Sequence, residues 1–332
     1  MGELILITGA DGMLGSSICR IALEQGYAVR AFIMPGRATN TLSDLPIEMY
    51  YGDILDMESL ELAMKGCQYV INVAANTTLW PRRLSIIQRV NFEGVTNITQ
   101  LVEKFQIKRF IQIGTANSFN HGPMSNPGNE QSPFQGNQFK LDYIDSKYAA
   151  QQFLLNKFKT DGLPVIIVNP TYMIGPFDSG PTSGKMILEL FRDNLPGYPS
   201  GGKNFVFSGD VALAVVNAIS RGRIGECYIA GNENLSFELF LKTACDARNK
   251  PFKVRRVSSM VMLSIGFFAS IAARITRRPP KLSYTMAKLA LENQYYSPEK
   301  ARSELAMPST PIKEAVNQCL TWWEENAYLE RA

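Results

Sequence analysis

The chain has 332 residues, of which 45% are hydrophobic, and a formal net charge of +4 at pH 7. This length allows two domains, or one large domain with a smaller cap, and the apolar content is enough for a sizeable core. Because the positive charge is small and spread along the chain, the composition gives no reason to expect a nucleic-acid partner.

The cysteine and histidine content narrows the chemistry further. The cysteines show no paired metal-ligand spacing, and an odd, scattered set is typical of thiols in a reducing compartment: Cys19, Cys67, Cys227, Cys245 and Cys319. His121 is the only histidine, so we expect neither a histidine-based metal site nor a catalytic triad. The first apolar run suits a strand better than a signal peptide, and we expect a cytoplasmic protein.

A glycine-rich turn near the N-terminus gives the first functional signal. The apolar run Leu4–Ile7 leads into Thr8–Gly15, and a helical pattern follows. Gly9 suits a tight turn, Gly12 the close approach of a pyrophosphate to the backbone, and Gly15 close packing of helix on strand. The spacing predicts a strand–turn–helix unit that binds a dinucleotide.

Strand and helix patterns alternate along the chain. We expect strands near 3–8, 27–33, 47–51, 68–73, 108–114 and 164–169, and helices over 13–25, 56–65, 83–106 and 142–160. This alternation predicts an α/β fold, a Rossmann-type doubly wound parallel sheet with a ligand crevice at the carboxyl ends of its strands. A further strand near 225–230 would rejoin the sheet. The dinucleotide-binding domain is then 1–170 with 201–232, and the smaller, interleaved substrate-binding domain is 171–200 with 233–332.

Tyr143 and Lys147 form a candidate pair for proton transfer. Residues four apart share a helix face, so the Lys147 ammonium can favour the phenolate of Tyr143, and such a tyrosine is a general acid/base for carbonyl chemistry. The spacing alone is weak, because the chain has 13 tyrosines and Tyr284 with Lys288 repeats the pattern. Context must decide between the two pairs.

Motifs in a fixed order supply that context. After Thr8-Gly9-x-x-Gly12-x-x-Gly15 come Gly52-Asp53-Ile54, Asn72-Val73-Ala74-Ala75, Asn91, Arg109 to Ala116, Tyr143-x-x-x-Lys147 and Asn169-Pro170-Thr171. In this order the chain resembles the extended branch of the short-chain dehydrogenase/reductase superfamily, the NAD-dependent epimerase/dehydratase family, over roughly its first 230 residues. The resemblance selects Tyr143 over Tyr284, which we expect on a solvated helix face.

The resemblance implies a role for each matching residue. Thr115, Tyr143 and Lys147 would be catalytic: Thr115 donates to the substrate oxygen, Tyr143 transfers the proton, and Lys147 also holds the nicotinamide ribose. Thr115 and Tyr143 would bind substrate together with Asn120, which coincides with a substrate-binding asparagine of the flavonol reductases. The implied cofactor contacts are Gly9, Ala10, Asp11, Gly12, Met13, Leu14, Arg37, Asp53, Ile54, Ala74, Ala75, Tyr143, Lys147, Pro170 and Met173.

The choice of nicotinamide cofactor rests on the end of the second strand. An acidic residue there would bind the adenine ribose of NAD, and a basic one the 2′-phosphate of NADP. This segment has no acid, and Met34 stands where relatives carry arginine, so Arg37 is the candidate ligand of the 2′-phosphate. We favour NADP(H), with NAD(H) as the alternative, and by family analogy Asp53 would bind the adenine amino group.

The expected substrate is small and apolar. The stretch from Asn169 to Ile187 is most similar to dihydroflavonol 4-reductase-like and 3β-hydroxysteroid dehydrogenase-like proteins. Gly114 replaces a usual serine and Asn72 a usual histidine, two changes beside the cofactor that should matter little. Phe119-Asn120 replaces the Tyr-Gly of sugar-active relatives, which weakens the case for a sugar substrate.

Three functions stay open. The first is an NAD(P)H-dependent oxidoreductase that interconverts a ketone and a secondary alcohol, with hydride passing to or from nicotinamide C4. The second is a nucleotide-sugar epimerase, which uses the same Thr, Tyr and Lys but must hold a diphosphate, with Arg248, Arg255 or Arg256 as candidates. The third is a non-catalytic dinucleotide sensor, which the Tyr143/Lys147 pair disfavours.

Two interaction surfaces are also suggested. The segment 257–273 is uncharged and has basic flanks. We expect it to be a buried or pocket-lining helix of the substrate domain, with a helix on a membrane surface as the alternative. A homodimer through 83–106 and 142–160 is the assembly that the resemblance implies.

Overall fold

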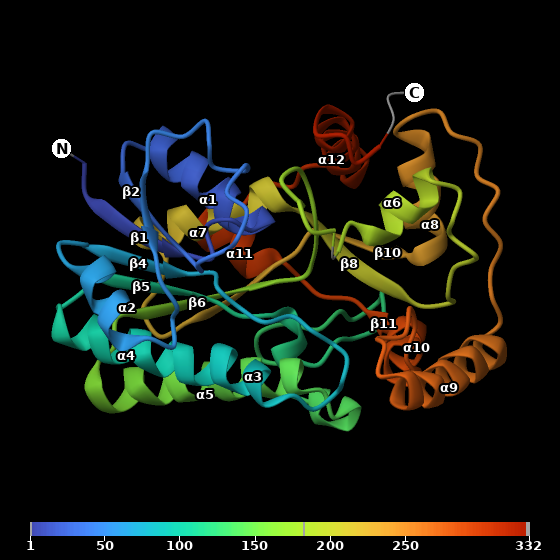
Figure 1. The fold of residues 1–332 in the computed structure, drawn as a ribbon, viewed down its shortest axis with the longest axis horizontal. Coiled ribbons are helices and arrows are strands. Elements are labelled where there is room, and N and C mark those ends of the chain that lie inside the picture. Colours follow the sequence, from blue (N-terminus) through green and yellow to red (C-terminus); the bar gives the residue numbers. More distant parts are fainter. Residues whose placement is uncertain (1, 182, 330–332) are drawn as a thin grey trace.

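A seven-stranded parallel sheet forms the larger half of the computed structural model, which describes residues 2–181 and 183–329 (Figure 1). Thr182 and the last three residues of the predicted substrate domain lie outside the described residues. The strand order is β3-β2-β1-β4-β5-β6-β9. The strands are β1 (Leu4–Thr8), β2 (Ala28–Ile33), β3 (Glu48–Tyr51), β4 (Tyr69–Asn72), β5 (Arg109–Ile113), β6 (Val165–Pro170) and β9 (Cys227–Ala230). The predicted Rossmann-type α/β fold is therefore confirmed.

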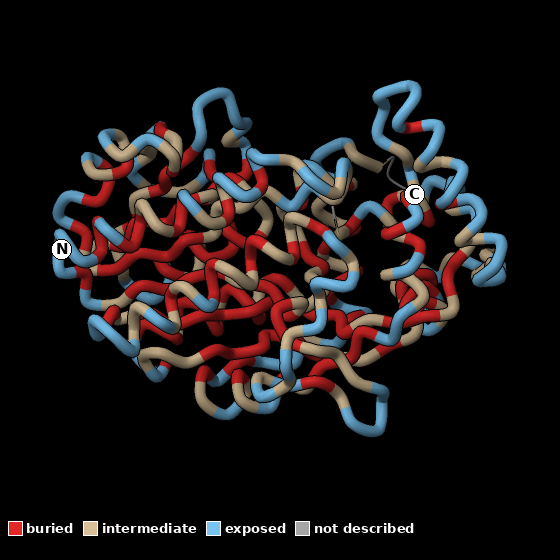
Figure 2. The backbone as a smooth tube through the Cα atoms, turned by 90° about the horizontal axis from the view of Figure 1, so that it is seen from below, coloured by how far each residue is buried: buried red, intermediate tan, exposed pale blue. Residues whose placement is uncertain are grey.

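Helices cover both faces of this sheet. One face carries α1 (Met13–Glu24), α7 (Ser208–Arg221) and α11 (Glu299–Leu305), and the other carries α2 (Met57–Met64), α4 (Gly94–Lys104) and α5 (Asp142–Asp161). Alternate residues of β1 face the two layers, with Ile5 and Ile7 in one core cluster and Leu6 in the other. Burial on both faces explains why these strands are continuous apolar runs. Figure 2 shows the resulting buried strands surrounded by exposed loops.

The helix predicted over 83–106 is broken in the structure. It consists of α3 (Ser85–Gln88), a π-helical turn over Arg89–Glu93, and α4. Asn91 lies in this turn and is buried, and its side chain binds the backbone of Asn76 and the hydroxyl of Ser146. Such turns accommodate a buried polar group that a regular helix would place differently.

A smaller sheet builds the second part of the molecule. Its central strand is β8 (Gly202–Phe207), which pairs with β7 (Tyr172–Ile174), β10 (Glu233–Ser236) and β11 (Asn293–Gln294). Around it lie α6 (Lys185–Phe191), α8 (Phe237–Asp246) and α12 (Ile312–Glu325). This pairing departs from the predicted division of the chain, because β8 falls within 201–232 yet belongs to the smaller sheet, while α11 packs on α7 beside the large one.

The helix expected to be buried at 257–273 is exposed. It is α9 (Ser259–Thr276), in which only Gly266 and Ala273 are buried, and it packs along α10 (Tyr284–Leu291). The expectation of a buried helix was wrong because an uncharged sequence suits a core and an external apolar surface equally well.

Phe205 should be a principal stabilising residue of the smaller sheet. Its ring is fully buried on β8 and stacks on Phe240 with ring centroids 3.9 Å apart. We expect Phe205→Ala to lower the free energy of unfolding by about 3–5 kcal/mol, because it leaves a cavity. Leu239→Ala, at a half-exposed position of the neighbouring helix, should cost less than about 1 kcal/mol. Urea unfolding followed by circular dichroism measures both, and equal losses would contradict the assignment.

Candidate active site

The glycine loop after β1 forms a cradle for a phosphate group. Gly9 has φ +62°, and a Cβ atom there would lie 2.8 Å from the backbone nitrogen of Ala74. Gly12 is different, because a Cβ atom there would meet only the Gly9 carbonyl oxygen, at 3.5 Å. The outer side of Gly12 is therefore open, and a side chain at this position would occupy the space that a pyrophosphate needs.

The amino end of α1 offers free donors at the same place. Gly12 is its N-cap, no side chain caps the helix, and its first turn has no acidic residue. The first N–H groups of a helix lack intrahelical partners and favour an anion. Ala10, Met13 and Leu14 belong to this loop and first turn, as the prediction requires. The residues present thus fit a bound dinucleotide.

Arg37 contacts the same loop from the end of β2. Its Nε donates to Oδ2 of Asp11 at 3.0 Å, while most of the Arg37 side chain remains exposed. Asp53 follows β3, and its carboxylate accepts from the backbone N–H of Leu55 at 3.0 Å. Ile54 is buried beside it. These residues line the part of the crevice where the adenosine of a dinucleotide would lie.

Thr115 and Tyr143 meet at the carboxyl end of β5. Thr115 caps the short 3-10 helix η2 (Ala116–Ser118), and its backbone N–H donates to Oδ1 of Asn169 at 2.9 Å. Burial raises the pKa of Tyr143, and a hydrogen bond with the neighbouring Thr115 side chain opposes that rise. The two hydroxyls are therefore close enough to act on one substrate oxygen.

Gly114 is required by this arrangement. A Cβ atom at Gly114 would overlap Oδ1 of Asn169, the atom that holds the Thr115 backbone. The absence of the usual serine at 114 is thus explained by the position of Asn169.

Lys147 is the last residue in a series of buried hydrogen bonds that runs from β1 through β4 to β5. Thr8 Oγ1 donates to Asn72 Oδ1 at 2.5 Å, and Asn72 Nδ2 donates to Gln112 Oε1 at 2.8 Å. Gln112 Nε2 and Lys147 Nζ both donate to the carbonyl oxygen of Ile113, each at 2.8 Å. Asn72 is fully buried and lies in the middle of this hydrogen-bond network, a structural role that its motif did not indicate.

The surroundings of Lys147 leave its ammonium poorly solvated. Burial alone lowers the pKa of Lys147 to about 8. Gln112 and Asn169 belong to motifs noted in the sequence, but neither was predicted to be a site residue. An amide next to a strand end is the signal that points to both. Helix α5 is held in place near this lysine by Asn91, which donates to Ser146 at 3.1 Å.

The second Tyr-x-x-x-Lys pair lies in a different environment. Lys288 Nζ is 4.9 Å from the centroid of the Tyr284 ring, and both residues are exposed on α10. This pair is outside the crevice, and neither residue adjoins the end of a strand in the large sheet.

Comparison with known proteins identifies the family. The model of the "NAD dependent epimerase/dehydratase family" matches residues 5–231. The chain belongs to this family. A Synechocystis protein named "Putative dihydroflavonol 4-reductase" is 30% identical over 99% of this chain and 97% of its own length. "Sterol demethylase protein B" of Methylococcus capsulatus is 25% identical, over 98% of this chain and 99% of its own.

A solved structure agrees with this assignment along the whole chain. The crystal structure of gox2253 superposes with a TM-score of 0.86 at 28% identity, covering 99% of this chain and 100% of the other. Family members are enzymes that act with a bound nicotinamide dinucleotide, so the residues that fit a dinucleotide here match the family's chemistry. Pro170 is the last residue of β6, and Ala74 and Ala75 follow the end of β4, so all three lie at the carboxyl edge of the large sheet, with β5 between the two strands. Met173 lies in β7, which pairs with β8 of the smaller sheet.

Asn120 lines a small hollow to which helix α5 contributes Ile144, the residue that follows Tyr143. The other lining side chains are mainly aromatic or amide and include Phe119, Phe139, Gln294 and Tyr296. His121 also lines the hollow and is half-buried, and burial lowers its pKa. Residues from both parts of the molecule thus meet in this hollow.

Lys203 is a partly buried cation that was not predicted from the sequence. It lies on β8, donates to Gln294 Oε1, and has its Nζ 5.5 Å from the centroid of the Tyr172 ring. Burial lowers the pKa of Lys203 to about 8. Its partner Gln294 lines the hollow at Asn120, so Lys203 adjoins the expected substrate region.

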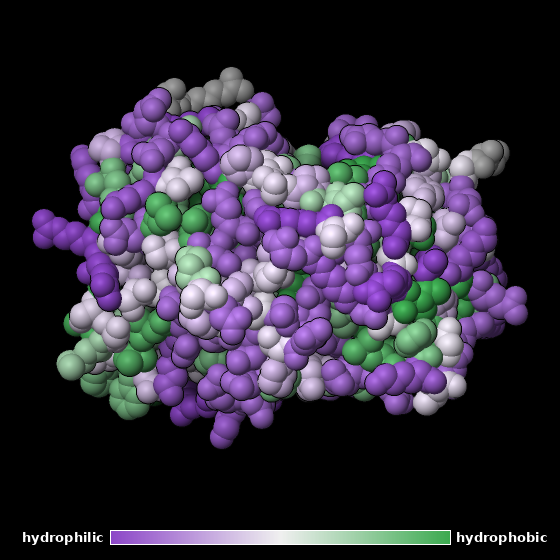
Figure 3. Space-filling model, turned by 180° about the vertical axis from the view of Figure 1, so that it is seen from behind, coloured by the Kyte–Doolittle hydropathy of each residue, from purple (hydrophilic) through white to green (hydrophobic). Residues whose placement is uncertain are grey.

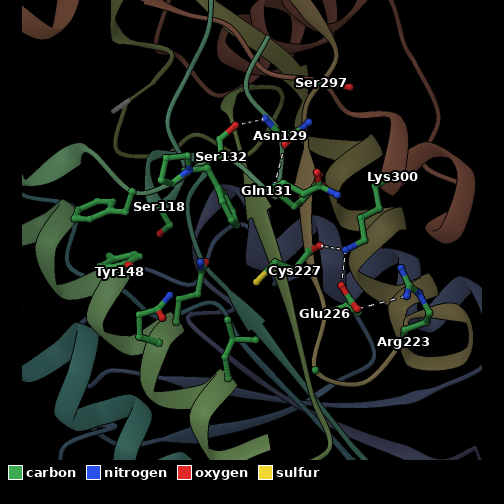
Figure 4. A pocket seen from close by; sticks show the side chains of 18 of the residues that line it. Ser118, Asn129, Gln131, Ser132, Tyr148, Arg223, Glu226, Cys227, Ser297 and Lys300 are labelled. Atoms are coloured by element: carbon green, nitrogen blue, oxygen red, sulfur yellow. Dashed lines mark hydrogen bonds and ion pairs between the residues drawn. The ribbon is translucent and has the colours of Figure 1, made fainter. Parts of the chain in front are cut away.

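A larger hollow lies elsewhere, along the edge strand β9. It has a volume of about 760 Å³ and is lined by residues of α5, β9 and α11, among them Tyr148, Cys227 and Lys300 (Figure 4). Two side chains cover the backbone of this edge. The Glu130 carboxylate accepts from Ile229 N at 2.7 Å, and Lys300 Nζ donates to Cys227 O at 2.8 Å. Such cover protects an edge strand from pairing with another chain. We do not assign this hollow to the reaction.

Dinucleotide binding should take up a proton at Lys147 in alkaline solution. Without cofactor the pKa of Lys147 is about 8, and a bound anionic cofactor favours the charged ammonium, so its pKa rises on binding. Above about pH 8, NADPH affinity should therefore fall by up to about tenfold per pH unit. Fluorescence titration with NADPH between about pH 7 and pH 10 measures this slope.

Two matched variants test the origin of that slope. Lys147→Met should abolish it, whereas Lys203→Met removes another lysine with the same pKa and should leave it intact. An unchanged slope in Lys147→Met would show that Lys147 does not bind the cofactor.

Proposed function

We propose that this protein is an NAD(P)H-dependent oxidoreductase that interconverts a ketone and a secondary alcohol on a small, apolar substrate. The observation that carries the proposal is the meeting of the Thr115 and Tyr143 side chains at the end of β5, one helical turn from the buried Lys147. A bound nicotinamide dinucleotide would supply or accept the hydride.

The chain's own residues would handle the proton and the substrate oxygen. In the reducing direction the Tyr143 hydroxyl gives its proton to that oxygen while the Thr115 hydroxyl donates a hydrogen bond to it. The Lys147 ammonium favours the resulting phenolate and binds the ribose of the cofactor. Asn169 fixes the Thr115 backbone, and the Ile113 carbonyl holds Lys147 in place.

An apolar substrate suits the hollow at Asn120, to which the residue after Tyr143 contributes. Phe119, Phe139, Ile144 and Tyr296 line this hollow, and Asn120 with Gln294 provides amide groups for orientation. The names of two relatives, a dihydroflavonol reductase and a sterol demethylase protein, are in keeping with a largely apolar ring system.

A nucleotide-sugar epimerase is the second candidate, since the family includes epimerases. Such an enzyme must bind a diphosphate. Arg248, one candidate for that role, instead donates to Thr321 at 2.7 Å and pairs with Glu324 at 3.5 Å on α12. This engagement reduces support for the epimerase and leaves Arg255 and Arg256, which are exposed.

Replacing Tyr143 by Phe should remove the proton donor. We expect kcat/KM for ketone reduction to fall by about 100-fold or more, while NADPH still binds. The assay follows NADPH and NADH absorbance with a panel of apolar ketones, including flavonoid and steroid ketones, and with UDP-sugars.

The repeated motif offers a matched control. Tyr284→Phe changes the exposed tyrosine of the second Tyr-x-x-x-Lys and should keep near wild-type turnover. Carbonyl turnover that survives in Tyr143→Phe would refute the mechanism. Epimerised UDP-sugar without net NADPH consumption would select the epimerase instead.

We further propose that NADP(H) is the preferred cofactor and that Arg37 recognises its 2′-phosphate. Arg37→Ala should raise KM for NADPH by roughly tenfold to a hundredfold, because a hydrogen bond between two charged groups is lost. KM for NADH should stay nearly constant.

Asp11→Asn provides the opposite change. It releases Arg37 from its ion pair and removes a negative charge from the crevice, so NADPH should bind more tightly. Equal effects of Arg37→Ala on NADPH and NADH would contradict a contact with the 2′-phosphate.

A further inference from the structure

Helix α9 presents an apolar surface that nothing else in the described chain covers. Of the fourteen large apolar side chains that are exposed within residues 2–181 and 183–329, seven lie on this one helix. Met260 is 79% exposed, Phe268 68% and Ile275 77%. In Figure 3 hydrophobic side chains gather at the lower left, the corner that α9 occupies when Figure 1 is turned round. Contiguous apolar surfaces of this kind mark interaction sites.

The charged residues that flank α9 in the sequence are all basic. Between residues 247 and 291 the chain has ten lysines and arginines and no aspartate or glutamate. Arg255 and Arg256 precede the helix, Arg274 lies in its last turn, and Arg277 with Arg278 follows it, all exposed. An apolar surface between clusters of basic side chains is complementary to a bilayer that contains anionic lipid.

The opposite side of α9 is fastened to the body of the protein. Gly266 is buried against α10, where a Cβ atom would lie 3.0 Å from Ser283 O, and Ser270 Oγ accepts from Tyr284 N at 2.9 Å. Before the helix, Val257 N donates to Tyr198 O at 2.9 Å. Beyond α10, the chain enters β11 of the smaller sheet. Both ends of the α9–α10 hairpin thus return to the same part of the fold.

We propose that α9 docks this protein on the surface of an anionic lipid bilayer, with its apolar face in the interface and the flanking arginines on the lipid headgroups. The helix lies in the plane of the membrane rather than across it. Its 18 residues span about 27 Å, short of the roughly 30 Å hydrocarbon core, and a spanning orientation would break its packing on α10.

Vesicle sedimentation of the full chain tests the proposal. The probes are vesicles of phosphatidylcholine alone and of phosphatidylcholine mixed with phosphatidylglycerol. We expect binding to the mixed vesicles, weakened by added salt, and little binding to the neutral ones. Arg277→Ala with Arg278→Ala should lower partitioning roughly tenfold at low salt, and Phe268→Ser with Ile275→Ser by tenfold or more in all conditions.

Matched controls distinguish binding through α9 from nonspecific adsorption of the protein and from the effects of misfolding. Met124→Ser with Leu239→Ser removes two apolar side chains that are at least half exposed elsewhere on the protein and should leave partitioning unchanged. The melting temperature and NADPH affinity of each variant report whether it is folded. Failure of folded wild type to bind mixed vesicles would overturn the proposal.

Two further outcomes would assign α9 another role and also overturn the proposal. Protein that stays with the membrane after an alkaline carbonate wash would show a spanning helix. A concentration-dependent dimer that Phe268→Ser with Ile275→Ser abolishes, without vesicle binding, would show that a second copy covers α9.

Discussion

The site depends on the ammonium group of Lys147, which is buried at the carboxyl edge of the large sheet. An isolated buried charge is costly, and the cost is reduced only when the charge is hydrogen-bonded or paired. Here the Ile113 carbonyl accepts from Lys147, and the same carbonyl is held by Gln112, whose amide continues through Asn72 to Thr8. Three neighbouring parallel strands therefore have to be in register for Lys147 to sit beside Tyr143.

This dependence explains the two departures from the family pattern next to the site. A histidine at 72 would have to replace both hydrogen bonds of the Asn72 amide within a fully buried space. A serine at 114 would displace Asn169, which holds the backbone of Thr115. Both changes are thus consistent with the hydrogen bonds of buried amides, those of Asn72 and Asn169.

The strands of the large sheet could be predicted from the sequence, whereas the side-chain hydrogen bonds between them could not. A strand buried on both faces must be an apolar run, so β1, β4, β5 and β6 are visible in the sequence, as is the glycine turn after β1. The partners in the buried chain are 64, 40 and 34 residues apart, and no local pattern encodes such a pairing. For the same reason the break at Asn91 escaped prediction, since its cause is a contact with Ser146 on another helix.

Only a few residues of the smaller sheet separate the hollow at Asn120 from the exposed α9–α10 hairpin. Helix α10 ends at Leu291, and Gln294 of β11 already accepts from Lys203 and lines the hollow at Asn120. The next two residues, Tyr295 and Tyr296, are buried, and the Tyr296 hydroxyl donates to the Phe119 carbonyl at 3.4 Å. The segment that follows the α9–α10 hairpin thus also lines the hollow at Asn120. The proposed membrane surface and the proposed substrate region are therefore joined by a short, largely buried stretch of chain.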